Sequence, residues 1–199
     1  MSRRPSPLAL VVLVLLHEQP LHTYRLHKLI VERGKDRVVN VASRNSVQQT
    51  VHRLEREGLI EAALTERAEG FPERTVYRIT EAGTDAMRST LREALSRPAS
   101  EYPVFVAALA SAAVEQPGVV AELLEERRRA VAAAIADQEP APPDMPRVLT
   151  IEEEYREHMA RAELAWLDRT LGELRSGNLD WDIADLVAWG RAVESGRPD

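Results

Sequence analysis

The stretch SRNSVQQTVHRLEREG, residues 43–58, decides the fold of this chain. Three of its apolar side chains recur at the i, i+4, i+7 spacing of one helix face, namely Val47, Val51 and Leu54. Ser43 can cap the first turn, and Gly58 can end the last one. The sequence therefore predicts a helix from about Ser43 to Glu57 that packs one face against a core.

The opposite face of this helix is rich in amides and arginine, and it lacks carboxylates before Glu55. Side-chain amides can pair with adenine, and arginine with guanine, in the major groove of DNA. A recognition helix inserts its N-terminal part into that groove. We therefore predict that the helix reads DNA, the alternative being an ordinary solvated face. The predicted contacts are Ser43, Arg44, Asn45, Ser46, Gln48, Gln49, His52 and Arg53.

Two helices are expected before this helix and two strands after it. Apolar spacing predicts helices over Leu8–Glu18 and Thr23–Arg33, and the short apolar stretch Val38–Val41 suggests a strand. Further along the chain, alternation and β-branched residues predict strands at Leu59–Glu66 and Arg74–Thr80, joined by a polar loop. Three helices followed by a two-stranded hairpin is the order of a winged helix-turn-helix.

The remaining segments are expected to be helical. Thr80 can cap a helix that runs toward Pro98. Pro103 and Pro117 suit the first turns of the next two helices, and the sequence TIEE from Thr150 has the pattern of a capping box. The expected helices of the second half are about 103–115, about 117–138, Thr150 to Ser176 and Trp181–Val193.

Charge divides the chain into two halves. Residues 1–98 hold 16 basic and 12 acidic side chains, whereas residues 99–199 hold 10 basic and 20 acidic ones. Within residues 22–56 there are 8 basic and 3 acidic side chains. Such asymmetry suggests that one half meets a polyanion. We therefore expect a DNA-binding domain with its connecting helix over 1–98 and a helical domain over 99–199.

Length and composition indicate a soluble globular protein. The chain has 199 residues, 44% of them apolar, a net charge of −6 and no cysteine. The absence of cysteine fits the cytoplasm and excludes disulfides and thiolate chemistry. The apolar run Leu8–Leu16 is shorter than the roughly 20 residues that cross a bilayer, so no membrane partner is expected. No Gly-rich phosphate loop, nucleophile elbow or metal-ligand spacing is present, so the sequence predicts neither an enzyme nor a cofactor.

Three motifs resemble the PadR family of bacterial transcriptional regulators. They are LHTYRL at 21–26, VHRLEREGLI at 51–60 and RTVYRITEAG at 74–83. The segment RAELAWL at 161–167 resembles the helical C-terminal domain of the longer PadR subfamily. The resemblance implies a mainly α fold with a small β-hairpin wing, in which an N-terminal winged helix-turn-helix precedes a C-terminal all-α dimerisation domain.

The chain departs from the family pattern at two positions. Thr23 stands where the family usually has glycine, and Gln48 stands where it usually has a tyrosine that often contacts DNA. That tyrosine contact is therefore not carried over. Hydroxyl and guanidinium groups on the second helix and the wing can hold phosphates, although acidic residues flank the wing arginines and Tyr24 also suits a half-buried core position. The further predicted contacts are Tyr24, Arg25, Arg67 and Arg74.

Two apolar stripes run along the 150–176 helix. One stripe can pack within the chain and the other needs a second surface, so we expect a homodimer, whose symmetry suits paired half-sites. A bundle that buries both stripes is the alternative. The predicted interface residues are Ile151, Tyr155, Met159, Trp166, Leu167, Leu171 and Leu174. Trp166 also suits the core, and family members often respond to phenolic compounds that a tryptophan ring could stack on.

The sequence thus predicts a homodimeric, sequence-specific regulator that binds double-stranded operator DNA, a repressor that an aromatic small molecule releases. Two alternatives remain open. One is a winged-helix module that docks another protein, and the other is a small-molecule sensor in which DNA binding is secondary. Salt separates DNA binding from protein docking, because phosphate contacts weaken steeply as salt rises. Tryptophan quenching by aromatic compounds would favour the sensor.

Overall fold

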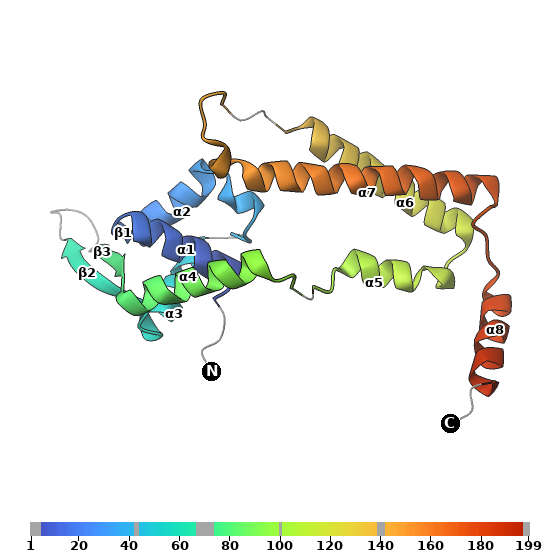
Figure 1. Ribbon diagram of the computed structural model, residues 1–199, viewed down its shortest axis with the longest axis horizontal. Coiled ribbons are helices and arrows are strands. Elements are labelled where there is room, and N and C mark those ends of the chain that lie inside the picture. The colour runs from blue at the N-terminus through green and yellow to red at the C-terminus, as the bar shows by residue number, and fades with distance from the viewer. Residues whose placement is uncertain (1–4, 42–43, 67–73, 100, 139–141, 197–199) are drawn as a thin grey trace. The chain divides into compact units, whose positions relative to one another are not determined.

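A computed structural model describes residues 5–41, 44–66, 74–99, 101–138 and 142–196 of the chain (Figure 1). The chain divides into two compact units, Met1–Ser100 and Glu101–Asp199. Each unit has its own apolar core. Among the described residues, no helix combines the length and the apolar content that crossing a bilayer requires.

Four helices build the first unit, and side chains cap the starts of three of them. Ser6 caps the first helix by accepting a hydrogen bond from the Ala9 amide at 3.3 Å, with proline at the first helical position. Thr80 caps the fourth by accepting from the Gly83 amide at 3.0 Å, as predicted. His22 caps the second. The helices are α1 (Pro7–Glu18), α2 (Thr23–Glu32), α3 (Arg44–Arg56) and α4 (Glu81–Ser96).

A three-stranded antiparallel sheet completes the first unit. Strand β3 (Arg74–Ile79) lies between β1 (Leu21–His22) and β2 (Ile60–Glu66). The hairpin of β2 and β3 was expected, but β1 was not, because two residues are too short for an alternating pattern. The prediction of a strand at Val38–Val41 is wrong. The chain there follows a 3-10 turn at Lys35–Arg37, and the burial of Val39 explains the apolar pattern.

The core of the first unit gathers around α1 and α3. α1 is apolar on almost every side and buries five residues, which suits a central helix. The predicted stripe of α3 is confirmed, because Val47, Val51 and Leu54 are no more than 1% exposed. Packing of this stripe leaves the opposite face of α3 on the surface.

All the regular secondary structure described in the second unit is helical. Its helices are α5 (Val104–Ala110), α6 (Pro117–Ala136), α7 (Ile151–Ser176) and α8 (Ile183–Ser195), with 3-10 turns at Ala112–Val114 and Arg147–Leu149. α5 is shorter than the expected 103–115 helix, because its last part is a 3-10 turn. The capping box at Thr150 is wrong as well. Its hydroxyl donates to the Arg147 carbonyl at 3.1 Å and caps no amide of α7.

The helices α6 and α7 form the body of the second unit (Figure 1). Val120 and Leu124 of α6 pack against Leu167 and Leu171 of α7, and these four residues form the buried core. Charged pairs border this core, including Arg127 with Glu163 at 2.5 Å. α8 follows Gly177, whose φ of 75° ends α7 in the left-handed conformation.

Candidate nucleic-acid interface

The exposed face of α3 carries polar side chains in one row. Asn45, Gln49, His52 and Arg56 are all exposed, and they lie opposite the buried apolar stripe. The structure therefore brings together amide, imidazole and guanidinium groups on one helix face. Such groups can donate hydrogen bonds to base edges, and side-chain amides can also accept them.

Two predicted residues lie at the edges of this row. Gln48 is exposed on the side of α3 that faces α2, and Ser46 is half-buried on the other side. The backbone of Arg44 begins α3, but its side chain lies outside the described residues, and Ser43 lies outside them entirely.

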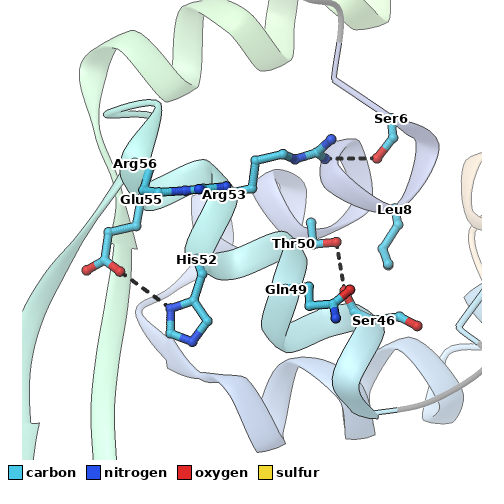
Figure 2. Close-up of a pocket in the computed structure, with 9 residues that line it drawn as sticks. All are labelled: Ser6, Leu8, Ser46, Gln49, Thr50, His52, Arg53, Glu55 and Arg56. Atoms are coloured by element: carbon cyan, nitrogen blue, oxygen red, sulfur yellow. Dashed lines mark hydrogen bonds and ion pairs between the residues drawn. The ribbon is translucent and has the colours of Figure 1, made fainter.

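Arg53 turns away from the exposed row toward α1 (Figure 2). Its Nη2 donates to Ser6 Oγ at 3.1 Å, while its Nε is enclosed and has no hydrogen-bond partner. The long side chain therefore joins α3 to the residue that caps α1. A base contact from Arg53, as the helical wheel suggests, would require this guanidinium to leave Ser6.

The start of α2 forms a second group of polar residues beside α3. A pocket of about 420 Å³ there, the α2 pocket, is lined by His22, Thr23, Tyr24, Gln48, His52, Thr75 and Tyr77. Tyr24 is 55% exposed at the mouth of this pocket. Burial raises the pKa of Tyr77, and the charge of Glu55 adds to the shift. The phenol of Tyr77 therefore stays neutral near neutral pH.

The second residue predicted on α2 has a partner of its own. The Arg25 guanidinium donates to Glu32 at 2.9 Å in an exposed pair. Exposed pairs of this kind contribute little to stability, typically about 0.2–1 kcal/mol. A phosphate could therefore displace Glu32 at small cost.

The wing is described only at its base. Arg67 lies outside the described residues, and Arg74 belongs to β3, but its side chain also lies outside them. At the base, Arg78 of β3 pairs with Glu61 of β2 at 2.8 Å. The two predicted wing contacts therefore remain predictions.

The structure adds three residues to this surface that sequence reasoning missed. Ser6 holds Arg53, His22 caps α2 by accepting from the Arg25 amide at 2.9 Å, and Thr75 lines the α2 pocket. The Ser-Pro pair at 6–7 is a typical helix start and could have indicated Ser6. Histidine is not a usual cap, so sequence carries no signal for His22.

The predicted dimer residues separate into two groups. Ile151, Tyr155 and Met159 are 54%, 66% and 52% exposed. Trp166 is half-buried and meets Phe105 edge-on, with ring centroids 6.2 Å apart. Leu167 and Leu171 are buried against α6 of the same chain, and Leu174 is partly buried beside them. Because they fill this core, Leu167 and Leu171 present no free surface to a second subunit.

Comparison with known proteins identifies the first unit. Residues 12–89 match the sequence model of the transcriptional regulator PadR-like family. Among curated proteins, no sequence matches this chain significantly.

Solved structures share the fold over most of the chain. PadR of Bacillus subtilis in complex with operator DNA is 16% identical with a TM-score of 0.62, and the match covers 84% of this chain and 98% of that one. A PadR-like regulator of Bacillus cereus is 20% identical with a TM-score of 0.57, covering 87% and 99%. The Vibrio cholerae virulence activator AphA is 23% identical with a TM-score of 0.57, covering 85% and 98%. Residues 12–89 of this chain therefore form a domain of the transcriptional regulator PadR-like family, and the chain shares its fold with solved PadR-family structures.

Proposed function

We propose that this protein is a homodimeric transcriptional regulator that binds double-stranded DNA through the exposed face of α3. The observation that carries the proposal is the row of Asn45, Gln49, His52 and Arg56 on a helix whose other face is buried. A helix fits the major groove, and these side chains match the hydrogen-bonding groups found there. The fold is shared with a Bacillus subtilis PadR solved on operator DNA, which supports this use of the domain.

The second unit supports the dimeric part of the proposal. The N-terminal half of α7 exposes Ile151, Tyr155 and Met159, although its C-terminal half is packed on α6. Monomers rarely leave adjacent large apolar side chains in water. A second copy would cover this face by two-fold symmetry and would place two α3 helices on one DNA duplex.

Repression and its release are the finer parts of the proposal. A dimer seated on a promoter blocks polymerase access, and an aromatic effector would release it. Two observations support an aromatic effector. A structure of Bacillus subtilis PadR holds p-coumaric acid, and Trp189 of α8 is 68% exposed here, where a planar ring could stack on it. Release of DNA together with quenched tryptophan fluorescence would support the effector.

The test is a fluorescence anisotropy titration of the purified protein with the duplex directly upstream of its own gene. A scrambled duplex of the same composition is the control, and both are titrated across a salt series. We expect tight binding to the upstream duplex and weaker binding to the scrambled one, with both affinities falling as salt rises. Equal weak binding to both duplexes would contradict a sequence-specific regulator. A reporter gene placed behind the same upstream DNA distinguishes repression from activation. We expect its expression to be higher in cells that lack the protein than in cells that contain it.

A further inference from the structure

Arg53 holds a positive charge that nothing described in the structure neutralises. Its guanidinium is tied to α1 by the 3.1 Å hydrogen bond to Ser6 Oγ, yet its enclosed Nε has no acceptor. Among the described residues, no carboxylate lies within ion-pair distance of it. A charge that is partly removed from water and lacks a counter-charge favours binding of an anion.

The surroundings of Arg53 form an open pocket that suits such an anion. This pocket, the α1 pocket, has a volume of about 860 Å³ and lies between Ser6 and Leu8 at the start of α1 and Ser46, Gln49, Arg53 and Arg56 of α3. It offers hydroxyl, amide and guanidinium donors. One carboxylate, Glu55, also borders it, but Figure 2 shows Glu55 turned toward His52, away from the Arg53 guanidinium. The Nδ1 of His52 lies 3.8 Å from Glu55.

The start of α1 adds to the positive potential of the pocket. Ser6 is the cap residue and Pro7 the first helical residue, so the positive end of the 12-residue helix α1 borders the pocket. Helix N-termini with a nearby guanidinium group are typical phosphate sites in proteins.

The α1 pocket and the α2 pocket lie on opposite edges of the exposed row of α3. Gln48 faces Tyr24 and Thr75 in the α2 pocket, whereas Ser46 and Arg53 face α1. A helix lying in the major groove has one phosphate backbone on each side. Each edge of α3 therefore has its own set of donors for one of the two strands.

We propose that the α1 pocket binds a backbone phosphate of the DNA strand opposite to the one that passes the α2 pocket, with Arg53 as its main ligand. This inference rests on the proposed function. Under this inference, Arg53 positions the DNA backbone and does not contact the bases. The N-terminus of α1 then also takes a direct part in DNA binding. Contacts to phosphate fix the register of a protein on DNA without reading its sequence.

The first test measures the salt dependence of DNA binding for Arg53→Met, which keeps the aliphatic stem and removes the charge. We expect affinity to fall about tenfold or more on the upstream and the scrambled duplex alike. The slope of log affinity against log salt should decrease by about 0.9 for each bound subunit. Arg33→Met is the matched control, because Arg33 pairs with Glu18 at the opposite end of α1 and carries the same charge. An unchanged slope in Arg53→Met would overturn the proposal.

A second test locates the phosphate and separates it from a merely structural role of Arg53. Methylphosphonate groups are placed one at a time along the upstream duplex, and each duplex is titrated with wild type and with Arg53→Met. We expect one position per half-site at which neutralisation weakens wild type but leaves Arg53→Met unaffected. If both proteins respond alike at every position, Arg53 does not hold a DNA phosphate.

These outcomes are distinct from failure of the proposed function. If wild type does not prefer its upstream duplex, the regulator itself is contradicted, whatever Arg53 does. Circular dichroism of Arg53→Met and of Ser6→Ala controls for folding. Ser6→Ala keeps the charge but removes the hydrogen bond that positions it, so it should reduce affinity less than Arg53→Met and leave the salt slope unchanged.

Discussion

At the scale of single residues, side-chain direction decides which α3 residues lie on the face that we propose for DNA binding. Gln49 and Arg53 are one turn apart, and a helical wheel places both near the polar face. In the structure Gln49 is exposed in the row, whereas Arg53 reaches across to Ser6. The helix pattern predicted the first position well. It could not predict the second, because Ser6 is 47 residues away in sequence and meets Arg53 only through packing.

The fold leaves no room for a side chain at Gly83. A Cβ atom at this position would lie 1.9 Å from the Leu59 carbonyl oxygen, because the first turn of α4 packs directly on the backbone before β2. We expect Gly83→Ala to lower the free energy of unfolding by about 1–3 kcal/mol or more, measured by urea denaturation. Gly172→Ala is the control, since nothing lies within 4 Å of its added Cβ in α7. That variant should be neutral or up to about 1 kcal/mol more stable. Equal stability of the Gly83 and Gly172 variants would contradict the packing.

At the scale of elements, the sequence predicted the helices and strands in which a periodic apolar pattern extends over many residues. The helices α1, α2, α3, α6 and α7 and the two long strands lie close to their predicted positions because burial sets their pattern. Short or context-dependent features were missed. β1 exists only because β3 pairs with Leu21 and His22. At Thr150, a preceding 3-10 turn takes the hydroxyl that the capping pattern assigned to α7.

The cap on α2 can be tested by substitution. His22 Nδ1 accepts from the Arg25 amide, so His22→Ala leaves that amide without a side-chain partner. We expect a loss of about 0.5–2 kcal/mol in the free energy of unfolding. His22→Asn supplies a new acceptor and should restore most of the loss. If both variants unfold at the wild-type denaturant concentration, the imidazole does not cap the helix.

Glu125 connects α6 to α7 and gives that connection a pH dependence. It accepts from Arg128 at 2.9 Å and from Arg175 at 3.0 Å, and these partners hold its pKa at about 2. A lowered carboxylate pKa stabilises the fold above the unfolded value near 4.5 and loses that effect as pH falls toward 2. Wild type should therefore lose more stability than Glu125→Gln over this acidic range, measured by denaturation at a series of pH values. Glu122→Gln, an exposed α6 residue without an ion pair among the described residues, should behave like wild type.

At the scale of the whole molecule, the first unit carries the groups that we propose for DNA binding, and the second unit exposes apolar surface. In α8, Ile183, Leu186, Val187 and Val193 are 49%, 39%, 46% and 42% exposed, and α7 adds its open N-terminal half. Sequence periodicity showed that α7 has two apolar stripes. It could not tell which stripe α6 would cover, because that depends on how the two helices pack.

The exposed stripe of α7 predicts the oligomeric state. We expect wild type to sediment with the mass of two chains, and Tyr155→Glu combined with Met159→Glu to sediment as one chain, because charges would enter the apolar contact. Arg161→Ala, on the flank of the same helix, is the control and should remain dimeric. A wild-type monomer, or a charged variant that still dimerises, would contradict the assignment of this stripe.

The central claim is that the exposed row of α3 reads DNA sequence, and Gln49→Ala tests it most directly. The measurement is the ratio of affinities for the upstream and the scrambled duplex, by fluorescence anisotropy at one salt concentration, for wild type and variant. Loss of a bidentate base contact should reduce the difference in binding free energy between the two duplexes by about 1–3 kcal/mol. The affinity for the scrambled duplex should stay nearly unchanged. An unchanged ratio in a folded, dimeric Gln49→Ala protein would contradict the claim.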